Sequence, residues 1–118
     1  MKPGKTGIRR IIDATGYSMK GLKAAWINEA AFRQEVMLTI VATIIAFLLP
    51  VGTLERTAMI ASVVLVVIVE LINSAIEAVV DRFGGELHEL SGRAKDIGSA
   101  AVFISLMLAG FVWLSVLL

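Results

Sequence analysis

Residues 57–81 read TAMIASVVLVVIVELINSAIEAVVD. The first half is an almost wholly apolar run of the kind that crosses a membrane as a helix, and the second half adds polar side chains to the same apolar setting. A helix turns by about 100° per residue, so these polar side chains share one face, and the other faces carry Val, Ile, Leu and Ala. The polar face consists of Glu70, Asn73, Ser74, Glu77 and Asp81. The stretch therefore predicts a membrane helix with a polar face.

The polar face is interpreted as a functional site. A charged side chain near the centre of a bilayer costs about 3 kcal/mol or more, so such groups usually face a protein interior or a water-filled cavity. The Cα atoms of Glu70 and Glu77 are expected about 10 Å apart along the helix, so one lies inside the hydrocarbon and the other near its edge. The alternative is that the polar groups only hold helices together, which suits a lone Asn or Ser better than two carboxylates.

The composition is typical of a small membrane protein. Of the 118 residues 58% are hydrophobic, whereas a soluble domain is usually about 45–50% apolar. The net charge is only +1, and no nucleic-acid partner is expected. Cysteine is absent and there is one histidine, which excludes disulfides, a cysteine nucleophile and a His-rich metal centre. Any metal must therefore be held by oxygen ligands, which suits Mg²⁺.

The N-terminal segment, residues 1–31, is expected to be a basic tail followed by a helix in the membrane interface. From Ile8 onward, apolar residues recur at helical spacing, with Arg, Lys and Asp between them and with a tyrosine and a tryptophan. Gly16 and Gly21 are expected to break or bend this helix. A basic amphipathic helix of this kind is typical of a segment that lies in the plane of the interface.

Three membrane spans are predicted after this helix. They cover residues 32–50, 57–80 and 97–118, and a charged loop, residues 81–96, joins the last two. The apolar part of the first span is short for a bilayer, so the residues before it should extend it. The basic N-terminus and the basic loop lie on one side, which the positive-inside rule makes cytoplasmic. The predicted fold is an all-α membrane protein, one domain over residues 1–118, with an interfacial helix and three transmembrane helices.

Charged residues from separate segments are expected to converge on the cytoplasmic edge of this bundle. They are Glu29, Arg33, Glu35, Glu77, Asp81, Glu86, His88, Glu89, Arg93, Lys95 and Asp96. Mixed carboxylates and cations beside a membrane are what Mg²⁺ and a polyphosphate require. Glu70 lies deeper, where a lipid hydroxyl could reach it, and suits a general base. The alternative for the loop charges, taken alone, is a solvated connection.

Three segments also resemble one known family. Residues 70–81 read ELINSAIEAVVD, residues 24–35 read AAWINEAAFRQE, and residues 88–96 read HELSGRAKD. In their order and spacing along the chain they closely resemble the corresponding segments of the prokaryotic diacylglycerol kinases, which are small integral-membrane lipid kinases. The resemblance covers nearly the whole chain, and no Walker or protein-kinase motif contradicts it.

The resemblance implies transfer of the γ-phosphate of Mg-ATP to the primary hydroxyl of diacylglycerol. It implies that Glu70 is the catalytic base with Asn73 in support, and that Glu29 and Glu77 are Mg²⁺ ligands. The implied nucleotide contacts are Arg10, Tyr17, Glu29, Glu77, Glu86, His88, Lys95 and Asp96. The implied lipid-lining residues are Arg10, Ala14, Met19, Lys23, Trp26, Ala31, Glu35, Leu48, Val51, Arg56, Glu70, Ser99 and Trp113.

The resemblance further implies a homotrimer in the bacterial inner membrane, with active sites shared between neighbouring chains. Three alternatives remain for the function. Related enzymes resemble this family yet phosphorylate undecaprenol, so the lipid acceptor is open. A small proton-coupled transporter could use one intramembrane carboxylate such as Glu70, although the charged loop argues against it. A non-enzymatic membrane subunit is also possible, but the polar face would then have no evident use.

Overall fold

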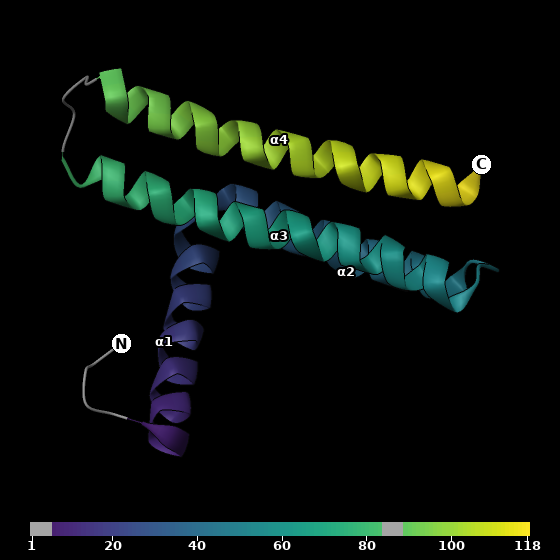
Figure 1. Cartoon of the computed structure of the whole chain (residues 1–118), viewed down its shortest axis with the longest axis horizontal. Helices are drawn as coiled ribbons and strands as arrows, with labels where there is room; N and C mark the ends of the chain where they lie inside the picture. The colour runs from purple at the N-terminus through teal and green to yellow at the C-terminus, as the bar shows by residue number, and fades with distance from the viewer. Residues whose placement is uncertain (1–5, 84–88) are drawn as a thin grey trace.

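The computed structural model describes residues 6–83 and 89–118, and in these ranges the chain forms four helices and no strand (Figure 1). The helices are α1 (Gly7–Asn28), α2 (Ala30–Leu48), α3 (Thr53–Asp81) and α4 (Glu89–Leu117). Three of them, α2, α3 and α4, are long and apolar enough to cross a membrane. The predicted all-α class with three membrane helices after an N-terminal helix is therefore confirmed.

The helix ends differ from the prediction at several places. Gly16 and Gly21 were expected to break or bend the first helix, but α1 runs through both without interruption, so a break there is wrong. A single glycine in a helix interior costs about 1 kcal/mol relative to alanine, which the neighbouring residues can offset. α3 begins at Thr53, because the Glu55 carboxylate accepts a hydrogen bond from the Gly52 N–H at 3.2 Å. Residues 89–96, expected in a loop, form the first turns of α4.

α1 and α2 are separate helices joined at a single residue. Glu29 has extended backbone angles, φ −120° and ψ 104°, so α1 ends at Asn28 rather than near Ala31 as expected. The Arg33 guanidinium donates hydrogen bonds to the carbonyl oxygens of Trp26 and Ile27, at 2.6 and 3.3 Å. These carbonyls belong to the last turn of α1, where the helix offers no partner of its own. Figure 1 shows the result: α1 projects across the direction of the other three helices.

α3 is the central helix of the bundle and packs against both α2 and α4. In Figure 1, α4 runs alongside α3 and α2 lies behind it. The buried residues of α3 recur every three or four positions: Met59, Ser62, Val63, Val66, Glu70, Asn73 and Ser74. The buried residues of α4 are small, namely Gly98, Ser105 and Ala109. Small residues on α4 allow the two helix backbones to approach closely, as is common between membrane helices.

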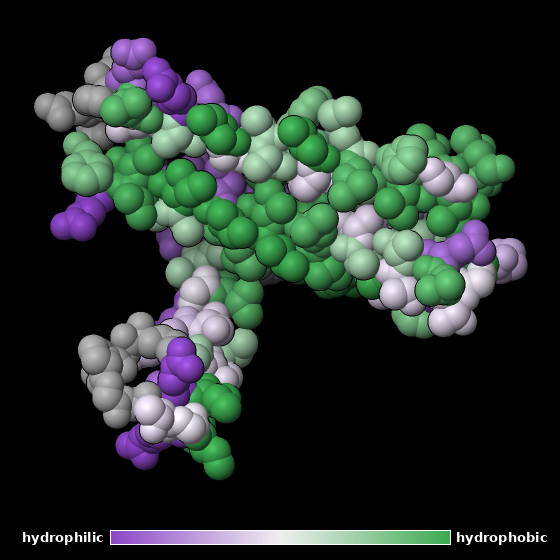
Figure 2. Space-filling view, in the orientation of Figure 1, coloured by the Kyte–Doolittle hydropathy of each residue, from purple (hydrophilic) through white to green (hydrophobic). Residues whose placement is uncertain are grey.

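The end of the bundle away from the polar face is fixed by two side chains that donate to backbone carbonyls. The Trp113 indole N–H donates to Met59 O at 3.1 Å and so connects α4 to α3. Arg56 Nε donates to Ala46 O at 2.9 Å, near the end of α2. The outer surface of α2–α4 is mostly hydrophobic, and hydrophilic residues gather at its ends and on α1 (Figure 2). This distribution suits a bundle surrounded by lipid.

Candidate functional site

The polar face of α3 changes from buried to exposed along the helix. The exposed fractions of Glu70, Asn73 and Ser74 are 4%, 8% and 8%, so these residues are enclosed by protein. Glu77 is half-buried and Asp81 is exposed. Glu70, which was predicted to lie deeper in the bilayer than Glu77, is therefore also the more completely covered by protein.

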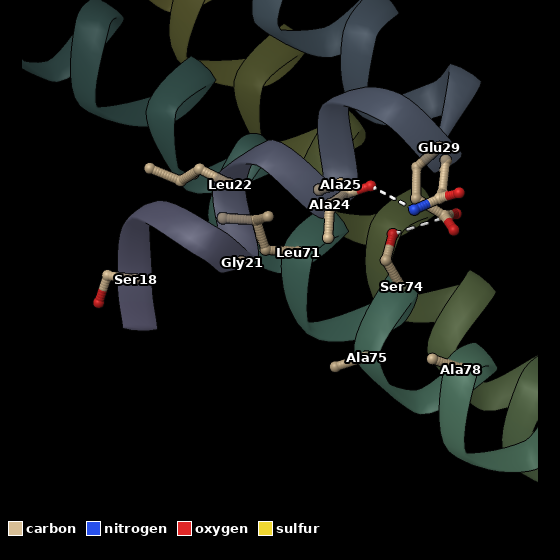
Figure 3. Close-up of a pocket in the computed structure, with 11 residues that line it drawn as sticks. Ser18, Gly21, Leu22, Ala24, Ala25, Glu29, Leu71, Ser74, Ala75 and Ala78 are labelled. Atoms are coloured by element: carbon tan, nitrogen blue, oxygen red, sulfur yellow. Dashed lines mark hydrogen bonds between the residues drawn. The ribbon is translucent and has the colours of Figure 1, made fainter. Parts of the chain in front are cut away.

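A serine connects carboxylates from two helices at the buried end of this face. The Ser74 hydroxyl lies 3.2 Å from Glu70 Oε2 and 3.4 Å from Glu29 Oε1, and it can donate a hydrogen bond to either oxygen. Figure 3 shows Ser74 and Glu29 pointing toward one another from α3 and from the α1–α2 joint. Sequence reasoning had placed Ser74 on the polar face without giving it a role. Its position one helical turn after Glu70 was the available signal.

α2 adds a further carboxylate to the same place. The side chain of Glu35 lies within hydrogen-bonding reach of the Glu70 side chain. Its Oε2 atom is buried and has no hydrogen-bond partner among residues 6–83 and 89–118. The resemblance implied only a lipid-lining role for Glu35. The structure brings it next to the residue expected to be the catalytic base.

The more exposed end of the polar face gathers charges of both signs. Glu77 interacts electrostatically with Glu29, Glu70, Asp81 and Lys95. Lys95 Nζ forms an ion pair with Asp81 Oδ1 at 3.0 Å, with both side chains partly open to solvent. This pair joins the end of α3 to the first turns of α4. A cation and several carboxylates are thus assembled where a polar co-substrate could reach them.

A cavity of about 620 Å³ lies between α1 and α3. Figure 3 shows its walls, which consist mainly of alanine and leucine side chains and Gly21, with Glu29 and Ser74 at one end. The lining residues from α1 are Ser18, Gly21, Leu22, Ala24, Ala25 and Asn28, and those from α3 are Leu71, Ser74, Ala75 and Ala78. An apolar cavity with polar groups at one end suits a ligand that is largely apolar.

Other residues expected at the site are either exposed or half-buried in a single chain, or lie at the other end of the bundle. Arg10, Tyr17, Met19, Lys23 and Trp26 are exposed along α1, and Ala14 is half-buried. Leu48, Val51, Arg56 and Trp113 lie at the other end of the bundle, since Arg56 is about 21 Å from Glu70 along α3. Ala31, Asp96 and Ser99 are exposed. Glu86 and His88 lie outside the described residues.

A metal would have to be held by few protein ligands. In the described part of the chain, no three side chains of His, Cys, Asp or Glu are grouped closely enough to bind an ion by themselves. Glu29, at the α1–α2 joint, and Glu77, in α3, are the expected ligands. Their carboxylates interact electrostatically. Mg²⁺ often takes only one or two protein carboxylates and completes its shell with phosphates and water. The pair of carboxylates is compatible with that mode of binding.

Comparison with known proteins adds to this geometry. A sequence model described as prokaryotic diacylglycerol kinase matches residues 16–117. The chain is 60% identical over 113 residues to the diacylglycerol kinase of Escherichia coli, a match that covers 96% of this chain and 93% of that protein. It is 54% identical over 115 residues to that of Pseudomonas aeruginosa (98% and 94% covered). It is 44% identical over 111 residues to that of Helicobacter pylori (94% and 87% covered).

Proposed function

The chain belongs to the prokaryotic diacylglycerol kinase family, and from this we propose that it transfers the γ-phosphate of ATP to the primary hydroxyl of diacylglycerol. The products are phosphatidic acid and ADP. One observation carries the proposal: Glu70 is buried in a helix that is long and apolar enough to cross a membrane, and the Ser74 hydroxyl connects its carboxylate to that of the half-buried Glu29. A lipid hydroxyl and a polar nucleotide could therefore meet there without either one leaving its own solvent.

Glu70 acts as the general base in this proposal. Its carboxylate takes the proton of the lipid hydroxyl, and the resulting oxygen attacks the γ-phosphorus. The bond between that phosphorus and the β,γ-bridging oxygen breaks, and its electron pair leaves with ADP. Asn73, one turn further on the same face, supports Glu70 or the phosphoryl group in transfer. The cavity between α1 and α3 gives the acyl chains an apolar surface beside Ser74, whose hydroxyl donates to Glu70.

Glu29 and Glu77 are the proposed Mg²⁺ ligands. Both residues are half-buried and their carboxylates interact electrostatically, so an ion that arrives with the nucleotide could contact both. When bound, Mg²⁺ neutralises part of the charge on the phosphates. The two ligands come from separate elements, Glu29 from the α1–α2 joint and Glu77 from α3.

The remaining nucleotide contacts and the assembly follow from the resemblance. Lys95 and Asp96 come from α4 near the Asp81 ion pair, and Glu86 and His88 precede them in the chain. Arg10 and Tyr17 are exposed on α1, away from Glu70, which supports a homotrimer in which one chain completes a neighbour's site. The N-terminus and residues 81–96 lie on the cytoplasmic side of the bacterial inner membrane, where ATP is available.

The test is an assay of purified protein in detergent with Mg-ATP and diacylglycerol, in which phosphatidic acid is measured. Parallel reactions with undecaprenol identify the preferred acceptor. We expect diacylglycerol-dependent formation of phosphatidic acid. The absence of lipid-dependent ATP consumption with either acceptor would refute the kinase proposal and would favour the transporter alternative.

Two substitutions test the roles of the carboxylates. Glu70→Gln should abolish turnover while leaving binding of Mg-ATP largely intact, because the base is lost and the metal ligands remain. Glu77→Gln should weaken binding of Mg-ATP, which a titration by isothermal calorimetry would measure. Equal and mild effects of both substitutions on turnover and binding would contradict this assignment.

A further inference from the structure

The buried amide of Asn73 lies directly against a glycine of α4. Asn73 is 8% exposed, and its Oδ1 atom has no hydrogen-bond partner among the residues that the structure describes. A Cβ atom added to Gly98 would overlap Asn73 Oδ1 and would also contact Ile76 Cδ1. The space that holds the amide therefore exists only because residue 98 has no side chain.

Gly98 differs in this respect from the other glycines of α4. At Gly92 and Gly110, a Cβ atom would meet no atom of residues 6–83 and 89–118 within 4 Å. Glycine is also less favourable than alanine in a helix interior. At position 98 this intrinsic cost is offset by the close approach of α3, whereas no such contact exists at position 110.

We propose that Gly98 is a positioning residue for phosphoryl transfer, which acts by leaving room for the Asn73 amide beside Glu70. This inference rests on the proposed function, since it gives the Asn73 conformation a role in turnover. A buried acceptor without a partner in the protein is free to bind a donor from a substrate or a bound water. A methyl group at position 98 forces Asn73 to another rotamer or separates α3 from α4.

Gly98→Ala is the direct test, with Gly110→Ala as the matched control on the same helix. We expect Gly98→Ala to lower kcat by about tenfold or more while the KM for ATP changes by less than about twofold. Such a split indicates an effect on the transition state rather than on nucleotide binding. Gly110→Ala should change neither parameter, because its new methyl group enters open space.

A second pair of variants separates positioning from simple helix packing. Ser is shorter than Asn and has no atom at the place of Oδ1, so Asn73→Ser should make room for alanine at position 98. We therefore expect the Asn73→Ser/Gly98→Ala double variant to have the same kcat and thermal stability as Asn73→Ser alone. This comparison remains valid even if Gly98→Ala by itself does not fold.

Different results would refute the role of Gly98 and the proposed kinase activity. If Gly98→Ala keeps the unmodified kcat, or loses no more than Gly110→Ala, then Gly98 does not position Asn73. The same conclusion follows if Gly98→Ala lowers kcat by the same factor in the Asn73→Ser variant as it does in the unmodified protein. In each case the unmodified protein would still make phosphatidic acid. Failure of the unmodified protein to do so would instead refute the proposed function.

Discussion

The hydroxyl of Ser74 lies 3.2 Å from Oε2 of Glu70, one helical turn before it on α3. The same hydroxyl lies 3.4 Å from Glu29 Oε1. A hydroxyl group carries a single hydrogen, so it can donate to only one of the two carboxylates at a time. Ser74 is therefore a donor shared between the proposed base and a proposed metal ligand.

Removal of this donor should slow catalysis. A hydrogen bond to a charged group contributes about 1.5 kcal/mol, so Ser74→Ala should lower kcat by about tenfold. The measurement is the rate of phosphatidic acid formation at saturating ATP and diacylglycerol. Ser105→Ala is the control, because Ser105 is also buried but donates to Val102 O within its own helix. Equal kcat values for the two variants would show that the Ser74 hydroxyl has no part in turnover.

Replacement of Arg56 should destabilise the bundle. Arg56 donates to Ala46 O at 2.9 Å and to Leu49 O and Val51 O at 3.3 Å each, which are carbonyls at the end of α2 and in the turn after it. Loss of these bonds in Arg56→Met should lower the free energy of unfolding by about 2 kcal/mol. Thermal denaturation in detergent would measure the change.

The control for this prediction is Arg93→Met. Among the described residues, Arg93 forms one exposed pair, with Glu89 one turn away on α4, at 3.4 Å. Such pairs contribute about 0.5 kcal/mol or less. If the two substitutions lower the melting temperature equally, the hydrogen bonds of Arg56 stabilise the fold no more than the exposed pair of Arg93 does.

The ion pair between Asp81 and Lys95 should matter more for the nucleotide than for the fold. Exposed pairs contribute less than about 1 kcal/mol, so Asp81→Asn and Lys95→Met should both leave the melting temperature nearly unchanged. Lys95→Met should nevertheless raise the KM for ATP by about tenfold, because it removes the charged hydrogen bond that Lys95 is proposed to donate to a phosphate. Asp81→Asn should raise it by less than about threefold. A similar rise in both variants would mean that Asp81, too, takes part in nucleotide binding.

The sequence was sufficient for features that depend on one helix at a time. The face shared by Glu70, Asn73 and Ser74 follows from helical periodicity, and the number of spans follows from the lengths of the apolar runs. Both are local properties of the chain. The burial of these three side chains in the structure agrees with the interpretation that charges there need a protein environment.

Features that depend on how helices are rotated against one another could not be predicted. The contact between Gly98 and Asn73 requires the register of α4 on α3, and the approach of Glu35 to Glu70 requires the rotation of α2 about its axis. The boundary between the interfacial helix and the first span was expected near Ala31, and its position at Glu29 was missed, because glutamate and the alanines after it favour a continuous helix. Its cause is a contact across the break, from Arg33 to the carbonyls of α1.

This break links the orientation of a whole helix to the position of one carboxylate. Glu29 is the single residue between α1 and α2, and a residue has only two freely rotating backbone angles. The tilt of α1 depends on the same φ and ψ that direct the Glu29 side chain. Any change in the orientation of α1 relative to the bundle therefore also changes the direction of the Glu29 carboxylate, a proposed metal ligand.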